Sequence, residues 1–285
     1  TVLTVEYKDA KFGNSETDTF TIEDIREGRA VIKTPEYSST SYTFDSWYEE
    51  EETPWKSGET FTEDDVNSHI VLTAKWVLTK NVLKDLVTEG SITTSDNSQF
   101  VVTISTLLNF AEDLEESDKT NIRIVGYGTL YAPEKFILNE EIKEKVQGRN
   151  HTEEGFYTDE ITNRLLNYYY NCSTPASEFN SEGFAIAATS GNKPNERWGA
   201  GWIAIQLNGN AEETIYVYAE PVKASDQTVD MEEALANVID AVPCDQTSAQ
   251  ESKVSEQNDE ETQTALPQVA PCTLEEYRQL RARRL

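Results

Sequence analysis

The sequence predicts a mostly β protein of the α+β class, with one helical insertion in its second half and an acidic C-terminal tail. Three observations support this prediction. Short segments of alternating apolar and polar residues, typical of half-buried strands, recur from Thr1 to Ala219. Helical spacing replaces the alternation between residues 134 and 170. Beyond residue 244, large apolar residues become rare, so we expect a largely disordered tail.

The chain is long enough for two domains of ordinary size. It has 285 residues, among them 13 Tyr, 10 Phe and 5 Trp, and disordered chains are poor in aromatic residues. We therefore expect a first domain at residues 1–78 and a second at 79–243, with the helical insertion at about 134–170. An acidic linker or tail at 244–285 then carries a short terminal helix.

Acidic residues outnumber basic ones by 52 to 24, which gives a formal net charge of -28 at pH 7. This charge repels phosphate backbones and anionic lipid headgroups, so it argues against nucleic-acid and membrane-surface binding. No run of about twenty apolar residues occurs, so we expect no membrane insertion. Simple solubility, a cationic partner and divalent cations stay open as interpretations of the charge.

The first domain is predicted to be a compact β module. Its strands are expected at Thr1–Tyr7, Asp18–Ile22, Arg29–Ile32, Tyr42–Tyr48 and His69–Val77. Turn residues surround Gly58, and a single capped helical turn is expected to begin at Thr62.

The motifs of this module are spaced in a specific way. Phe44, Trp47 and Tyr48 lie on one strand, Pro54, Trp55 and Gly58 mark a turn, and Leu72, Ala74, Lys75 and Trp76 close the module. In this the segment resembles the Listeria–Bacteroides repeat, the β-grasp-like B repeat of internalin-type surface proteins. Ser46 stands where that family has Gly, and Lys11-Phe12-Gly13-Asn14 replaces its Gly-Gly turn. The resemblance implies a β-grasp-like fold and a display role.

We expect Phe44, Trp47, Leu72 and Trp76 to form the core of the module. Large aromatic residues on alternating strands usually pack inside, so Trp47 and Trp76 are expected to pack against each other. Trp55, in a turn, is expected to be half exposed.

The second domain is predicted to be β-sandwich-like. Strands are expected at Ser91–Thr94, Gln99–Leu108, Ile122–Tyr131, Phe184–Ala188, Gly199–Leu207 and Thr214–Ala219. Asn208-Gly209-Asn210 predicts a hairpin between the last two. This region resembles, more weakly, sandwich-like domains of large clostridial surface proteins.

Besides the short terminal helix, helices are expected at four places. Residues 78–86 are predicted to form a helical linker, and Met231–Ala241 a short helix. Within the insertion, one helix face is expected from Phe136, Ile137, Ile142 and Val146, and another from Phe156, Ile161, Leu165 and Leu166, ending at Tyr168-Tyr169-Tyr170.

Signatures of catalysis are sparse. The two histidines, His69 and His151, are isolated, and Cys172 follows a tyrosine run rather than a nucleophile elbow. No metal-ligand spacing is found, so we expect no cofactor and, at the acidic runs Glu49–Glu52 and Glu63–Asp65, at most weak Ca²⁺ binding. Cys244 and Cys272 bracket the tail and are candidates for a disulfide, although three pairings of the cysteines are open.

These observations predict a non-catalytic segment of an exported bacterial cell-surface protein, a spacer, adhesion or display module. Because the chain opens on a strand without Met, we interpret it as a mature or excised fragment and expect any signal or anchor to lie outside it. The alternatives are a carbohydrate-binding accessory module of an exported enzyme and a head or fibre protein of a bacterial virus. The partner is expected to be a host or cell-surface protein or a glycan, and the oligomeric state stays open.

The candidate binding residues are aromatic. Trp55, Trp198 and Trp202 are candidates for stacking on a sugar, and the hairpin Gly199–Ala219 with Tyr168, Tyr169 and Tyr170 is the candidate binding patch. In a rival interpretation, which we favour for the strand residues, Trp202, Tyr216 and Tyr218 lie in the core.

Overall fold

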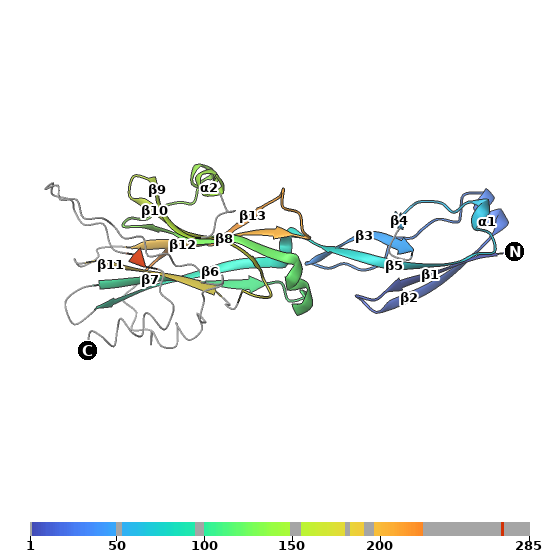
Figure 1. Cartoon of the computed structure of the whole chain (residues 1–285), viewed down its shortest axis with the longest axis horizontal. Coiled ribbons are helices and arrows are strands. Elements are labelled where there is room, and N and C mark those ends of the chain that lie inside the picture. Colours follow the sequence, from blue (N-terminus) through green and yellow to red (C-terminus); the bar gives the residue numbers. More distant parts are fainter. Residues whose placement is uncertain are drawn as a thin grey trace. The chain divides into compact units, whose positions relative to one another are not determined.

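The computed structural model describes residues 2–49, 53–94, 100–148, 155–179, 183–190, 197–224 and 269–270 (Figure 1). The fold is mostly β, as predicted, with several antiparallel sheets. The chain divides into two compact units. The first consists of Thr1–Val82 and Ala111–Leu114, and the second of Leu83–Phe110 and Glu115–Leu285.

The first unit contains one five-stranded sheet and short helical turns. Its elements are β1 (Val2–Asp9), β2 (Asn14–Thr21), α1 (Ile22–Arg26), β3 (Tyr42–Glu49), β4 (Thr53–Trp55), the 3-10 turn η1 (Glu63–Asp65), β5 (His69–Leu78) and the 3-10 turn η2 (Lys80–Val82). The strand order is β2-β1-β5-β3-β4. The central strands β1 and β5 are parallel, with Thr4 opposite His69, and the other pairs are antiparallel. The segment Arg29–Ile32, predicted as a strand, contributes only one bridge, between Val31 and Thr60.

One face of this sheet carries the core of the first unit. Alternate residues of β1 and β5, including Leu3, Val5 and Leu72, are fully buried. An irregularity in the pairing of β3 with β5, between Phe44 and Ser46, brings Phe44 and Trp47 to the same face.

The predicted core residues of the module lie on or beside this face. Trp47 is 3% exposed and donates a hydrogen bond from Nε1 to Lys33 O at 2.8 Å. Trp76 is half-buried and donates from Nε1 to Asp9 Oδ1 at 3.2 Å. Phe44 lies between the two indoles, with ring centroids 5.4 Å from Trp47 and 5.6 Å from Trp76. The tryptophans thus pack on Phe44.

The short segment Ala111–Leu114 is held in the first unit by the carboxylate of Asp113. This carboxylate accepts hydrogen bonds from Ser39 Oγ at 2.5 Å, Ser41 Oγ at 2.6 Å, Thr40 N at 2.8 Å and Ser41 N at 3.2 Å. Partial burial raises the pKa of Asp113, but the hydrogen bonds outweigh it and hold the pKa far below its ordinary value.

The second unit contains two sheets and one longer helix. Its elements are β6 (Leu83–Thr94), β7 (Phe100–Phe110), the 3-10 helix η3 (Glu116–Asn121), β8 (Ile122–Ala132), α2 (Glu140–Gln147), β9 (Gly155–Thr162), β10 (Leu165–Pro175), β11 (Gly183–Ser190), β12 (Trp198–Leu207), β13 (Ile215–Tyr218), β14 (Val222–Lys223) and β15 (Val269–Ala270). One sheet has the order β13-β12-β8-β10-β9, with β14 also paired to β12, and the other the order β15-β11-β7-β6.

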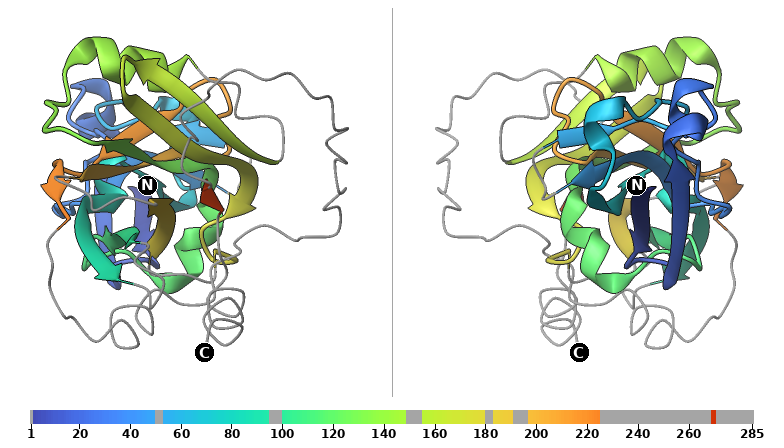
Figure 2. Two further views of the ribbon diagram at one scale, coloured as in Figure 1. Left: turned by 90° about the vertical axis from the view of Figure 1, so that its left-hand side faces the viewer. Right: turned by 90° about the vertical axis from the view of Figure 1, so that its right-hand side faces the viewer.

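The two sheets of the second unit pack closely against each other. A Cβ atom at Gly201 would lie 2.1 Å from Thr106 Oγ1, and Gly201 N donates to Thr88 Oγ1 at 3.0 Å. Helix α2 lies on the other face of the six-stranded sheet (Figures 1 and 2). Strands β8, β10 and β12 are therefore buried on both faces, and most consecutive residues along each of them are buried.

One prediction for this unit is wrong. Residues 156–170, predicted to be helical, form the hairpin of β9 and β10 instead, with a turn at Arg164, whose φ is 77°. Strands buried on both faces lose their alternation, so the apolar positions of this segment matched a helical period by chance. The predicted helical linker at 78–86 is also wrong beyond Val82, because Leu83 begins β6.

Other predictions for this unit are confirmed. Strands occupy the predicted positions in β7, β8, β11, β12 and β13, and Asn208 and Gly209 adopt positive φ in the turn of the β12–β13 hairpin. Within the predicted insertion, α2 is confined to Glu140–Gln147, so Ile142 and Val146 are helical as predicted, whereas Phe136 and Ile137 precede the helix and that part of the prediction is wrong. Met231–Ala241, the terminal helix, Cys244 and Cys272 lie outside the described residues. Of the predicted tail, Val269 and Ala270 form β15 and pair with β11.

Candidate functional site

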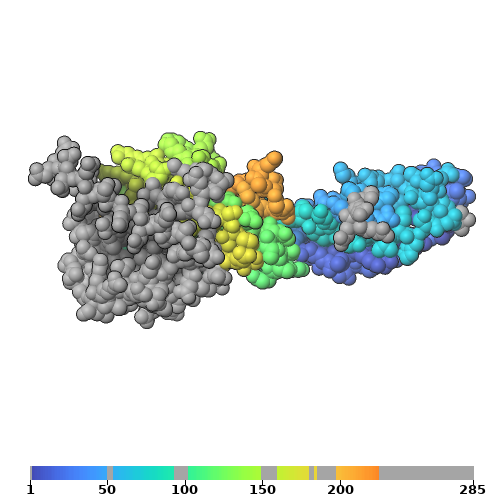
Figure 3. Space-filling model, viewed as in Figure 1, coloured from blue at the N-terminus to red at the C-terminus, as the bar shows by residue number. Residues whose placement is uncertain are grey.

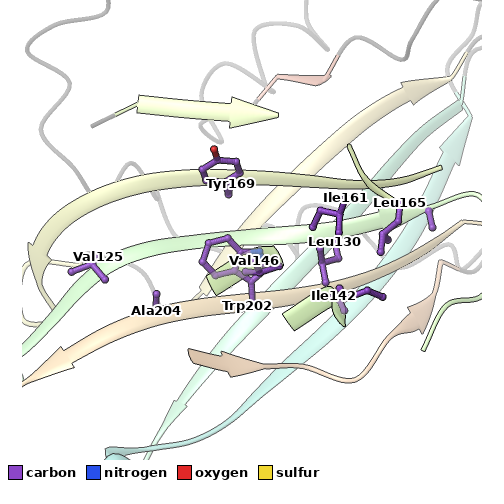
Figure 4. Close-up of a cluster of buried hydrophobic side chains, with 11 residues drawn as sticks. Val125, Leu130, Ile142, Val146, Ile161, Leu165, Tyr169, Trp202 and Ala204 are labelled. Atoms are coloured by element: carbon purple, nitrogen blue, oxygen red, sulfur yellow. The ribbon is translucent and has the colours of Figure 1, made fainter. Parts of the chain in front are cut away.

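The outer face of the six-stranded sheet carries a cluster of apolar side chains beneath α2 (Figure 4). At its centre Trp202 is fully buried and donates from Nε1 to Asn167 Oδ1 at 2.8 Å. Gly128 provides the space for the indole, because a Cβ atom there would lie 2.9 Å from Trp202 Cε2 and 2.7 Å from Tyr169 Cβ.

Helix α2 is positioned by its cap and by its buried face. Asn139 is the N-cap and accepts a hydrogen bond from Ile142 N through Oδ1 at 3.0 Å. Ile142 and Val146, one turn apart, are buried against the sheet, as predicted for one helix face. Two tyrosines of β13 bind the helix backbone: Tyr216 Oη donates to Gln147 O at 3.3 Å and Tyr218 Oη to Lys143 O at 3.4 Å.

An open groove of about 640 Å³ lies beside this cluster. Ligand sites in proteins have volumes of this order. Its walls are the segment 135–138 before α2, the edge strand β13, and Trp198 at the start of β12, with Lys143 and Glu220 also in the lining. We call this the β13 groove. The surface of β13 and its turn is orange in Figure 3.

Apolar and aromatic side chains reach the surface at the β13 groove. Ile137 is 78% exposed, and Trp198, Tyr216 and Tyr218 are half-buried. Lys135 Nζ lies 5.5 Å from the centroid of the Trp198 ring. The Trp198 Nε1 atom is buried and has no hydrogen-bond acceptor among the described residues. The groove therefore combines apolar and aromatic side chains with charged groups.

The tyrosines of the groove are neutral at physiological pH. Burial raises the pKa of Tyr218 to about 12 and raises that of Tyr216 above its ordinary value, with a further upward contribution from Tyr218. Neither side chain acts as a general base under these conditions.

Three of the predicted binding residues are interior. Trp202 and the tyrosines Tyr168 and Tyr169 are 0%, 3% and 9% exposed, so the expectation that they form a surface patch is wrong. They lie on strands that are covered on both faces. The rival interpretation predicted this burial in the core for Trp202. Burial also raises the pKa of Tyr168 to about 12. Tyr170 is half-buried and stacks on Tyr127 with ring centroids 5.6 Å apart.

The other two predicted tryptophans lie in different units. Trp55 belongs to β4 rather than a turn, is half-buried as predicted, and packs on Phe61 with ring centroids 5.4 Å apart. Trp198 lines the β13 groove. The sequence analysis placed Phe136 and Ile137 on a helix face rather than in a binding site, and it did not single out Lys135, Leu138 or Glu220. The signal at 135–138 was an apolar run, Phe136-Ile137-Leu138, placed before a helix cap, where a loop is expected to be polar.

The residues weighed for catalysis or metal binding are engaged in structural contacts. Cys172 is 1% exposed, with Sγ 3.4 Å from Ile124 O. Glu63 pairs with Arg26 at 3.0 Å, and Asp65 accepts hydrogen bonds from Thr62. Over the described ranges no group of three or more His, Cys, Asp or Glu residues is arranged to hold a metal ion. His151 falls outside these ranges.

In the described part of the chain, no helix has both the length and the hydropathy that are needed to span a membrane. Comparison of the chain with protein-family models, curated proteins and solved structures gives no match.

Proposed function

We propose that this chain is a non-catalytic segment of an exported bacterial surface protein, in which the first unit is a spacer and display module and the second unit binds a partner on another surface. The observation that carries the proposal is the β13 groove, an open depression lined by apolar and aromatic side chains. Concave sites that combine apolar and aromatic side chains with a few polar groups are where proteins bind ligands.

Two features of the first unit support the display role. The strand order β2-β1-β5-β3-β4, with a parallel central pair and α1 following β2, agrees with a β-grasp-like module. The positions that carry the resemblance to the Listeria–Bacteroides repeat also have structural roles, since Trp47 and Leu72 are buried and Trp76 binds Asp9.

Two features of the second unit support binding rather than catalysis. Its face-to-face sheets agree with a β-sandwich-like domain, which gives the groove a rigid support. The nucleophile considered in the sequence, Cys172, is enclosed by the fold, and the tyrosines of the groove hold their protons. An accessory carbohydrate-binding module is the second candidate, favoured by the half-buried indole of Trp198 in the groove.

The experiment measures attachment of the labelled protein to intact host cells and to immobilised extracellular glycoproteins. We compare the parent with Ile137→Asp, which places a charge at the most exposed apolar side chain of the groove. The matched control is Val87→Asp. Val87 is 39% exposed and lies between the buried residues Leu86 and Thr88, so it points away from the interior of the sandwich.

Saturable attachment that Ile137→Asp removes and Val87→Asp preserves is the expected result. Equal attachment of the parent and Ile137→Asp would contradict the role of the groove. Turnover of glycosidase, peptidase or esterase substrates by the purified parent would contradict the non-catalytic part.

A further inference from the structure

Strand β11 lies beside the short strand β15 of the C-terminal segment, which covers part of its edge. All eight residues of β11 pair with β7 on one side. On the other side Ala187 pairs with Ala270, and Ala188 with Val269, in an antiparallel contact. Figure 1 shows β15 as the short red arrow beside β11. Without β15, β11 would be an end strand of this sheet in the described part of the chain.

The end strands of the sheets differ in how they are protected from pairing with other chains. An end strand exposes a row of unpaired N–H and C=O groups, and proteins protect it with charged residues, with proline, by keeping the strand short or by covering it. The other end strands in the described strand orders have protection of the first three kinds: β2 contains Glu16 and Asp18, β6 Lys84, Asp85 and Glu89, and β9 Asp159 and Glu160, while β4 has three residues including Pro54 and β13 has four residues. Each of these strands is thus protected by its own length or sequence.

Strand β11 has no such protection in its own sequence. Its eight residues, Gly183–Ser190, include no charged residue and no proline, although the chain contains 52 acidic and 24 basic residues. Segments of low charge without proline are prone to pair with other chains when they lie on an exposed edge. The contact with β15 is therefore the protection that this edge has in the described part of the chain.

The covering strand is short. Pro267 and Pro271 lie on either side of Gln268, Val269 and Ala270 in the sequence. Proline lacks the backbone N–H that a β ladder requires, so the two prolines limit the length over which β15 can pair. A contact of two residue pairs opens more readily than the pairing of core strands. It nevertheless competes with other chains, because β15 belongs to the same chain and its local concentration at β11 does not depend on the protein concentration.

We infer that β15 is a removable cover of the β11 edge, and that the uncovered edge pairs with β11 of a second copy of this chain. The charge of the chain favours this pair of edges. Two copies with a formal charge of -28 each repel one another, and contacts through β2 or β9 would add acidic side chains at the junction. Two β11 strands bring no charged side chains of their own together. In an antiparallel arrangement with two-fold symmetry, the same residues of both copies pair and the two sheets become continuous. The inference concerns a surface other than the β13 groove and does not depend on the proposed function.

The test measures the mass of the full chain by analytical ultracentrifugation over a wide range of protein concentrations. The first variant, Val269→Pro with Ala270→Pro, removes both backbone N–H donors of β15. The matched control, Thr264→Pro with Ala265→Pro, places two prolines in the same part of the sequence but outside β15.

A further variant tests whether association occurs through β11. It adds Ala187→Lys to the proline pair of β15, because a lysine on an edge strand opposes pairing with another chain. Successive residues of a strand lie on opposite faces of the sheet. Ala187 pairs with Thr103 and therefore lies on the face opposite to that of the buried Ile104.

We expect the proline pair of β15 to lower the dissociation constant of the dimer by about tenfold or more, the effect of losing the hydrogen bonds of a two-residue contact. The control should dimerise as the parent does, and Ale187→Lys should reverse the gain. Circular dichroism checks the fold, and Val269→Gly with Ala270→Gly, which lowers strand propensity, gives a second reading if the proline pair unfolds the second unit. A proline pair that dimerises no more strongly than the parent would overturn the inference. Equal association of the control variant, or dimers that Ala187→Lys leaves unchanged, would overturn it as well.

Discussion

At the scale of single residues, Asp113 shows how one side chain can place a segment that the sequence does not mark. Nothing in the run Glu112–Glu116 distinguishes Asp113 from its acidic neighbours. Its carboxylate nevertheless accepts four hydrogen bonds from the segment Ser39–Ser41, 72 to 74 positions earlier in the chain. The sequence alone could not identify these donors, because they belong to a loop that is far away in the sequence and approaches Asp113 only in the folded unit.

The first prediction concerns this carboxylate. Asp113→Asn is expected to destabilise the first unit by about 1–3 kcal/mol, since it weakens charge-assisted hydrogen bonds. The folded-state pKa of Asp113 lies below the unfolded value of about 4, so its contribution is present above about pH 4 and is lost as the pH falls through the folded pKa. Urea denaturation of the parent and the variant at pH 7 and at pH 3 measures the difference, which should be smaller at pH 3. A difference that is equal at both pH values would contradict the assignment.

At the scale of elements, strand prediction succeeded in β1, which has one exposed face, and in β8 and β12, which are covered on both faces, but it failed in β10. In β1, polar and apolar residues alternate, and alternation alone located the strand. In β10, seven of the eleven residues are buried, so alternation disappears and Leu165 and Leu166 were assigned to a helix. The covering by α2 and by the second sheet, which depends on the whole fold, decides this case.

The lining of the β13 groove likewise could not be predicted in full from the sequence. The sequence singled out Trp198, but it could not show that the segment 135–138 and β13 would form the other walls, because that depends on how α2 lies on the sheet. Trp202 was named as a binding candidate for its residue type alone, and the covering helix places it inside.

The second prediction concerns the cap of α2. Asn139→Ala removes the hydrogen bond to Ile142 N and is expected to destabilise the second unit by about 0.5–2 kcal/mol, whereas Asn139→Asp retains an acceptor at the helix N-terminus. Because residues 135–138 lead into this cap, Asn139→Ala is also expected to weaken binding at the β13 groove. Thermal denaturation and the attachment of labelled protein to cells provide the two readouts. If the aspartate and alanine variants behave alike, the cap does not have this role.

At the scale of the whole molecule, the two units have separate hydrophobic cores. One cluster, around Leu3, Val5 and Leu72, belongs to the first unit, and the clusters around Trp202 and Ile104 belong to the second. The sequence placed a boundary after residue 78 from the end of the closing strand, whereas the first compact unit extends to Val82 and includes Ala111–Leu114. The composition of Ala111–Leu114 does not indicate that these four residues pack with the first unit.

The last prediction is that each unit responds to damage in its own core. Trp47→Ala removes a buried indole from the first unit, at a cost of about 3–5 kcal/mol. Gly201→Ala forces a Cβ atom against Thr106 in the second unit, at a cost of about 1–3 kcal/mol. Amide hydrogen exchange under native conditions follows β1 and β5 for the first unit and β8 and β12 for the second, because these strands provide the cores.

Trp47→Ala should accelerate exchange in β1 and β5 and leave β8 and β12 unchanged, and Gly201→Ala should do the reverse. The control is Gly148→Ala, where the added Cβ meets its nearest atom, Glu144 O, at 3.4 Å, so exchange should change little in either unit. If Trp47→Ala accelerated exchange in β8 and β12 as strongly as in β1 and β5, the chain would unfold as one cooperative unit. Separate responses would instead allow the second unit to keep its groove intact while the first unit opens, because local unfolding stays within one core.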